Sequence, residues 1–118
     1  MDITADVRSA VGEAGGSAVL VYVPHTTAGV TINEHIDPEL VTDLEDALES
    51  VVRDDWRWRH DDQDGPNAPS HVRAALIGSS VTVPLHEDGS LALGTWQGIF
   101  FCEFDGPRDR TVYVSVLA

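Results

Sequence analysis

The chain has 118 residues, 42% of them hydrophobic, and none of its apolar runs approaches the roughly 20 residues that a membrane-spanning helix requires. This length and composition predict one globular domain over residues 1–118. The 20 acidic residues outnumber 7 basic ones, all arginine, and the net charge of −13 argues against nucleic acid and anionic membranes as partners.

Charge and composition also bear on the environment of the protein. An excess of carboxylates suits a high-salt cytoplasm, where ions screen their mutual repulsion, so we expect a halophilic protein. Met1 is followed by neither a basic nor an apolar leader, which favours a cytoplasmic location. Cys102, the only cysteine, lies in an apolar run and is expected to be a small buried residue rather than a nucleophile.

Three stretches with apolar residues at helical spacing predict three helices. Each begins at a residue whose side chain can cap a helix N-terminus, and the first and third end at glycine. The recurring apolar positions give each helix one face that packs on the rest of the domain. The caps are Thr4, Asp37 and Ser70, and the helices cover residues 4–14, 37–53 and 70–77.

Runs of β-branched and aromatic residues predict strands between these helices. Proline, glycine and Asp-Gly pairs bound the runs, as turns require, and Ala28-Gly29 is expected to be a turn. The predicted fold class is α+β, with an antiparallel sheet on which the helices pack. The strands are expected at residues 17–23, 30–32, 80–84, 91–93, 98–104 and 111–117.

Three histidines lie where regular structure begins or ends. His25 follows the first strand, His71 opens the third helix, and His60 lies in a long loop at residues 54–69. Long loops inside compact domains are often functional, and neutral imidazoles can bind metal or transfer protons near neutral pH. If they converge, these histidines could hold one divalent ion with an open position, although no HxH or HExxH pattern is present.

A second polar group precedes the long helix. Asn33, Glu34 and Asp37 lie between a strand end and a helix N-terminus, where free main-chain N–H groups favour an anion. Together with His25 and the hydroxyls that follow it, they predict an anion site around these N–H groups.

Ordinary structural roles compete with each of these interpretations. His25 can bond a main-chain carbonyl, His60 can be solvated, and His71 can be a polar residue of a first helical turn. The acidic run at residues 61–64 lacks the alternating ligands of a calcium loop and is typical of a solvated acidic face. The loop tryptophans Trp56 and Trp58 are expected at an interface.

Three strings, HTTAGVTINEHIDPELVTDLE, HDDQDGPNAPSHVRAALIGSSVTVPL and LALGTWQGIFFCEFDGPRDR, closely resemble the YjbQ family, whose members are described as secondary thiamine-phosphate synthases. The resemblance covers about residues 3–116. It implies a single compact domain with a β-sandwich-like sheet, assembled as a homotrimer with sites near the subunit boundaries. The family's motif positions fall on His25, Thr27, Asn33, Glu34, Asp37, His60, His71, Gln97 and Arg108.

Family members usually begin with an additional N-terminal strand, and this sequence starts almost at the segment after it. Either the start is truncated or this member has lost that edge strand, and a missing strand would leave a sheet edge to be blunted or covered. The expectation bears on assembly more than on the site.

The activity implied by the resemblance joins a hydroxymethylpyrimidine diphosphate to a thiazole phosphate and releases pyrophosphate. A divalent ion, Mg or Zn, would stabilise the leaving group in a chain with few basic residues. The implied roles are catalysis by His25, Glu34 and His71, metal binding by His25, His60 and His71, and substrate binding by Thr27, Asn33, Asp37, Gln97 and Arg108.

Two other functions use the same residues. A metal-dependent hydrolase of a small phosphorylated metabolite would activate water with them. A non-enzymatic trimer would bind a small anionic ligand without turning it over. Release of inorganic phosphate without coupling favours the first, and binding without turnover favours the second.

Overall fold

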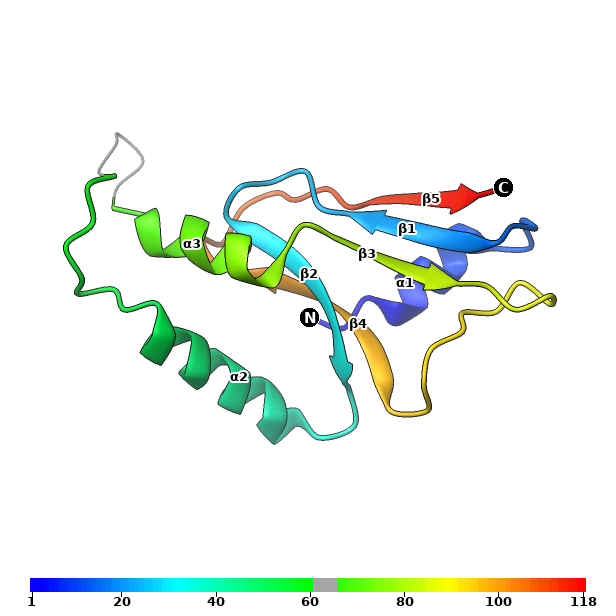
Figure 1. Ribbon diagram of the computed structural model, residues 1–118, viewed down its shortest axis with the longest axis horizontal. Coiled ribbons are helices and arrows are strands. Elements are labelled where there is room, and N and C mark those ends of the chain that lie inside the picture. Colours follow the sequence, from blue (N-terminus) through cyan, green and yellow to red (C-terminus); the bar gives the residue numbers. More distant parts are fainter. Residues whose placement is uncertain (61–65) are drawn as a thin grey trace.

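Two antiparallel sheets lie against each other in the computed structural model of the protein, which describes residues 1–60 and 66–118 (Figure 1). The predicted α+β class, a single compact domain with a sandwich-like arrangement of antiparallel strands, is confirmed. In chain order the elements are α1 (Thr4–Val11), β1 (Ala18–Tyr22), β2 (Ala28–Glu34), α2 (Pro38–Val51), α3 (Ala68–Ile77), β3 (Ser80–Pro84), β4 (Gln97–Glu103) and β5 (Tyr113–Leu117).

One sheet has the order β3-β1-β5, and the other pairs β2 with β4. Val19 and Val21 of the central strand β1 are fully buried, as expected from alternation on a strand with one face inward. They pack in one cluster with residues of α1, β2 and β4, among them Val7, Val30 and Ile99. The apolar residues of the predicted strands therefore form the core between the two sheets.

Two connections cross from one sheet to the other and run beside each other at one end of the molecule. Residues 23–27 lead from β1 to β2, and residues 104–112 lead from β4 to β5. The main-chain N–H of Phe104 donates to the Thr27 carbonyl over 3.1 Å, which ties the two connections together. Helix α3 packs on β2 next to them. We call residues 23–27 and 104–112 the crossing segments.

Two predicted helix caps are wrong because their hydroxyls bind distant groups. Thr4 lies inside α1, and its Oγ1 accepts from the Ile99 N–H over 2.9 Å. Ser70 lies inside α3, which begins after Asn67, and it donates to the Phe104 carbonyl over 2.5 Å. The first helix also ends early, at Gly12, whose positive φ of 58° stops it.

Two strand predictions also need correction. Ala28 and Gly29 belong to β2 and do not form a turn. A side chain on Gly29 would put its Cβ 2.6 Å from the Gly78 carbonyl oxygen, so glycine serves close packing there. Leu91 makes only an isolated bridge to Leu85, and residues 91–93 are not a strand.

The long helix α2 begins as predicted and lies apart from the sheets (Figure 1). Asp37 caps it by accepting from the Glu39 N–H over 3.0 Å, and Pro38 occupies its first position. No residue of α2 is buried. Its apolar side faces the outer surface of β2 and β4 across a groove of about 760 Å³. We call this the α2 groove; its apolar lining includes Val41, Leu44, Leu48, Val51, Phe100 and Phe104.

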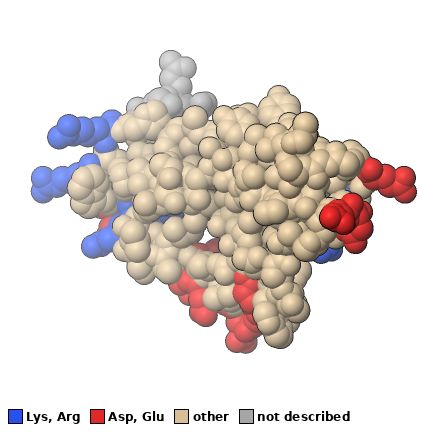
Figure 2. All heavy atoms as spheres, turned by 45° about the vertical axis from the view of Figure 1, so that its right-hand side comes forward, with Lys and Arg blue, Asp and Glu red and all other residues tan. Residues whose placement is uncertain are grey.

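The surface charge is unevenly distributed over the molecule. On the face shown in Figure 2, arginines gather mostly toward one end, and carboxylates toward the other end and the lower edge. Four of the seven arginines lie at residues 53–73, and five carboxylates lie on α2 at residues 39–49. Among the described residues, no helix is long and apolar enough to cross a membrane.

Candidate functional site

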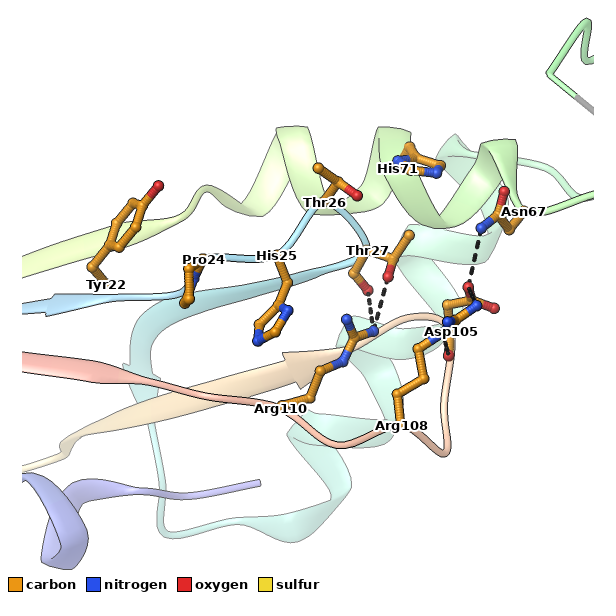
Figure 3. A pocket seen from close by; sticks show the side chains of 10 residues that line it. All are labelled: Tyr22, Pro24, His25, Thr26, Thr27, Asn67, His71, Asp105, Arg108 and Arg110. Carbon is orange, nitrogen blue, oxygen red and sulfur yellow. Dashed lines mark hydrogen bonds and ion pairs between the residues drawn. The ribbon is translucent and has the colours of Figure 1, made fainter. Parts of the chain in front are cut away.

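A polar pocket of about 600 Å³ opens where the two crossing segments meet the first turns of α3 (Figure 3). We call it the His25 pocket. Four residues predicted from the sequence line it, namely His25, Thr27, His71 and Arg108. Its other lining residues are Tyr22, Pro24, Thr26, Asn67, Asp105 and Arg110.

His60 lies next to this pocket through its contact with His71. The two imidazole rings meet edge to face, with centroids 5.0 Å apart and an interplanar angle of 87°. The loop histidine and the helix histidine therefore do converge. The acidic run at residues 61–64, which follows His60, lies outside the described residues.

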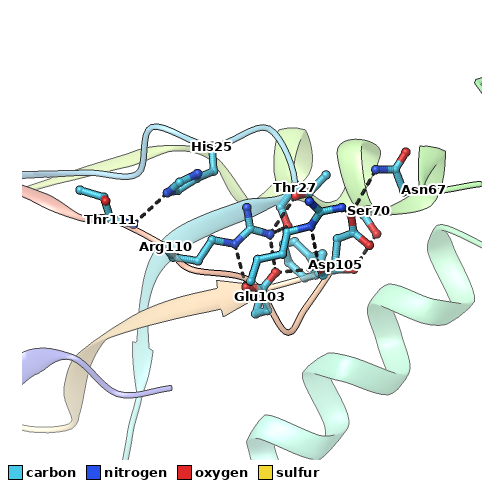
Figure 4. A network of polar contacts seen from close by, with 10 residues as sticks. His25, Thr27, Asn67, Ser70, Glu103, Asp105, Arg110 and Thr111 are labelled. Carbon is cyan, nitrogen blue, oxygen red and sulfur yellow. Dashed lines mark hydrogen bonds and ion pairs between the residues drawn. The ribbon is translucent and has the colours of Figure 1, made fainter. Parts of the chain in front are cut away.

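Arg110 is the most tightly held cation of the pocket (Figure 4). Its Nε donates to Glu103 over 2.8 Å, and its Nη2 donates to the other Glu103 oxygen and, over 2.8 Å, to Thr27 Oγ1. The hydrogen bond from Arg110 holds the pKa of Glu103 below its usual value, although partial burial opposes the shift. The same pair raises the pKa of Arg110. The guanidinium is therefore charged and fixed in place.

Arg108, on the same crossing segment, is held by a second network of hydrogen bonds. Its Nε donates to the Asp105 carbonyl over 2.9 Å, and its Nη2 donates to the Asp105 carboxylate over 2.8 Å. Asn67 donates to the same carboxylate oxygen over 3.1 Å. These bonds, the one from Asn67 first, lower the pKa of Asp105 against the effect of burial. Asn67 Oδ1 is buried with no partner among the described residues.

His25, in the crossing segment 23–27, is held by a hydrogen bond from the other crossing segment, residues 104–112. The main-chain N–H of Thr111 donates to His25 Nε2 over 2.9 Å (Figure 4). Side chains from residues 23–27 are thus bonded directly to residues 104–112, which gives the pocket two walls joined by hydrogen bonds. The arrangement presents guanidinium, imidazole and hydroxyl groups to one space, and these groups bind oxyanions.

The remaining predicted residues lie at the far end of β2. Asn33 Oδ1 accepts from the Glu34 N–H over 2.7 Å, and Glu34 accepts from the Asp37 N–H over 3.2 Å. Gln97, paired with Glu34 across the sheet, accepts from the Gly94 N–H over 2.8 Å. These side chains hold the turns that flank β2 and β4. The length of β2, about 20 Å for a seven-residue strand, separates them from the His25 pocket.

A metal centre is not assembled by the described part of one chain. Within residues 1–60 and 66–118, no group of three His, Cys, Asp or Glu side chains could hold a metal ion. His60 and His71 are close to each other, but Nε2 of His25 already accepts a main-chain hydrogen bond. The divalent ion expected from the sequence therefore stays a prediction.

Sequence reasoning missed Arg110, Asn67 and Asp105. A signal for Arg110 was present, because it lies two residues after Arg108 and alternate residues of an extended segment share a side. Its partner Thr27 is 83 positions away, so only the fold reveals the contact.

Trp56 and Trp58 contact each other edge to face, with ring centroids 5.1 Å apart, and they line neither the His25 pocket nor the α2 groove.

A family model described as UPF0047 protein YjbQ-like matches residues 1–118. The chain belongs to the YjbQ family. Among YjbQ relatives, a UPF0047 protein of Methanocaldococcus jannaschii is 45% identical, with 99% of this chain and 83% of that protein covered. UPF0047 protein YugU of Bacillus subtilis is 43% identical, with 99% and 88% covered.

Solved structures of YjbQ proteins have the same fold. A YjbQ/UPF0047 protein of Clostridium acetobutylicum superposes with a TM-score of 0.90 at 44% identity, covering 99% of this chain and 89% of that one. A protein of unknown function from Sulfolobus solfataricus gives 0.88 at 35% identity, with 97% and 83% covered. The family suggested by the three sequence strings is therefore confirmed.

Proposed function

We propose that the His25 pocket binds the phosphate of a small phosphorylated substrate. Two guanidinium groups, two imidazoles and two threonine hydroxyls line a space of about 600 Å³, which is within the range of small-molecule sites. Guanidinium groups match the geometry of phosphate oxygens. The single observation that supports the proposal most is Arg110, held rigidly by Glu103 and Thr27 at the wall of the pocket.

The reaction that we propose is the one implied by the family resemblance, a thiamine-phosphate-synthase-like transfer. The thiazole nitrogen forms a bond to the methylene carbon of hydroxymethylpyrimidine diphosphate while the carbon–oxygen bond breaks, and pyrophosphate leaves with the electron pair. Arg108 and Arg110 would stabilise the negative charge that develops on the leaving group. His71, beside His60, would donate a proton to the oxygen of the departing pyrophosphate.

Asn33, Glu34, Asp37 and Gln97 do not line the His25 pocket of their own chain, although Asn33 and Glu34 line the α2 groove together with Arg108 and Arg110. We therefore propose the homotrimer implied by the family, in which a second copy would have to supply these groups. The exposed apolar lining of the α2 groove supports self-association, because monomeric proteins rarely leave such patches uncovered.

A coupling assay tests the proposed reaction. Purified protein is incubated with both substrates, with each one alone, and with added Mg or Zn, and pyrophosphate, inorganic phosphate and the coupled product are quantified. Arg110→Lys should lower kcat/KM for coupling by at least about tenfold, because a lysine cannot reproduce the forked contacts of a guanidinium. Arg8→Lys, on the exposed side of α1, is the matched control.

The products distinguish the alternatives. Release of inorganic phosphate without coupled product would show a hydrolase. His60 and His71 could support that activity by activating water. Saturable binding of phosphate without turnover of any substrate would show a ligand-binding trimer. Metal analysis of the purified protein tests the divalent ion separately, and absence of stoichiometric metal would count against it.

A further inference from the structure

The hydrogen bond to His25 fixes where its ring proton lies. The main-chain N–H of Thr111 points at His25 Nε2 over 2.9 Å. A main-chain N–H only donates, so Nε2 must accept through its lone pair. The proton of the neutral imidazole is then on Nδ1.

The protonated Nδ1 belongs to a residue that lines the His25 pocket (Figure 3). Among residues 1–60 and 66–118, the only hydrogen bond of His25 is the one from Thr111, so Nδ1–H is available to a ligand. Arg110 offers a comparable group. Its Nε and Nη2 are used by Glu103 and Thr27, and Figure 3 places the remaining Nη1 on the side of His25.

We infer that His25 binds an oxyanion of the ligand as a neutral hydrogen-bond donor, through Nδ1–H and beside Nη1 of Arg110. The Thr111 main chain is the positioning group that holds the ring in this tautomer. This role differs from metal binding and from proton abstraction, because both need a free lone pair on a ring nitrogen. The only lone pair of neutral His25 is on Nε2, where the Thr111 N–H occupies it.

The inference rests on the proposed phosphate site, and two substitutions at one position test it. In His25→Asn, the amide nitrogen can take the place of Nδ1–H and keep a donor toward the ligand. In His25→Gln, the amide oxygen can take the place of Nε2 and keep the acceptor for Thr111, while the donor toward the pocket is lost. The two variants therefore separate ligand binding from the structural contact.

Inorganic phosphate is the probe, titrated by calorimetry. We expect His25→Asn to bind phosphate within about threefold of the wild type and His25→Gln to bind about tenfold more weakly, as loss of one hydrogen bond predicts. His86→Asn and His86→Gln, in an exposed turn, are the matched controls and should bind as the wild type does. Thermal unfolding of all variants shows whether each is folded.

The tautomer is read directly by NMR on protein labelled with ¹⁵N-histidine, with His25 assigned from its absence in His25→Asn. Long-range proton–nitrogen correlations should show Nδ1 protonated and Nε2 unprotonated, and phosphate should shift the Nδ1 resonance most. A ring protonated on Nε2, or a weaker binding of His25→Asn than of His25→Gln, would overturn the inference.

The outcomes distinguish the inference from the proposed function. If the wild type binds phosphate but the NMR pattern or the variant order is reversed, only the role of His25 is wrong. If the wild type does not bind phosphate at all, the proposed site is wrong, and the donor role is wrong with it.

Discussion

The Glu103 carboxylate holds Arg110 at the wall of the pocket, so the ionisation of Glu103 bears on the stability of the fold. Its hydrogen bonds from Arg110 hold its pKa below the reference value of 4.5, so it stays ionised to lower pH in the folded chain than in the unfolded one. A carboxylate with a lowered folded pKa stabilises the fold above its unfolded pKa. That stabilisation is lost as the pH falls through the folded pKa.

We therefore predict that Glu103→Gln weakens the acid dependence of stability. The wild type should lose unfolding free energy as the pH falls from about 5 to about 3, and the variant should lose less over the same range. Urea denaturation at several pH values measures this. The control is Glu87→Gln, in an exposed turn. Equal slopes for Glu103→Gln and the wild type would contradict the prediction.

Gly29 shows how one missing side chain lets α3 and β2 pack. A Cβ at this position would lie 2.6 Å from the Gly78 carbonyl oxygen and 3.2 Å from Ile77 Cγ2. We predict that Gly29→Ala lowers the free energy of unfolding by about 1–3 kcal/mol, as overpacking does. Gly15→Ala, with nothing within 4 Å of its Cβ, should change it little when both are measured in urea.

Residues near the ends of elements were partly predictable from the sequence. His25 and His71 could be selected because the chain leaves a strand at one and enters a helix at the other. Thr4 and Ser70 were assigned as caps by local propensity, but the fold gives their hydroxyls to Ile99 and Phe104. A contact with a residue more than 30 positions away leaves no local pattern to detect.

At the scale of elements, α2 has a clear sequence signature, but it is poorly packed against the rest of the fold. Its cap, its proline and its apolar spacing identify it, but no residue of it is buried. Sequence patterns therefore predicted the helix, while only the structure shows that its apolar side lies over an open groove. The segment at residues 91–93 is the opposite case, a strand-like run for which the fold provides no pairing beyond one bridge.

Hydrogen exchange should separate α2 from the sheets. Because opening α2 exposes few buried apolar groups, we predict that its main-chain amides exchange faster than those of β1 at concentrations where the protein is monomeric. Exchange followed residue by residue by NMR measures this. Protection in α2 equal to that in β1 under those conditions would show that the helix is held more firmly than its contacts suggest.

At the scale of the whole molecule, assembly can be tested through the same groove. Leu48→Glu places a charge on the apolar side of α2 and should lower the molar mass measured by light scattering to that of the monomer. Leu117→Glu, at the exposed end of β5, should keep the wild-type mass. A trimer that persists in Leu48→Glu would mean that copies associate elsewhere.

The net charge of −13 makes a second prediction for the whole molecule. Repulsion among carboxylates destabilises a compact state, and in about 1 M salt the screening length falls to about 3 Å. We expect the free energy of unfolding to rise from low salt to molar KCl. Equal stability in the two solutions would end the interpretation of the protein as halophilic.

The crossing segments make ligand binding in the His25 pocket relevant to the stability of the fold as well as to its chemistry. Each wall of the pocket runs from one sheet to the other, so a ligand touching both walls would hold together the two connections between the sheets. Binding only the folded form raises the temperature at which a domain melts. Candidate metabolites could therefore be ranked by how far each raises the melting temperature of the protein, before any turnover has been detected.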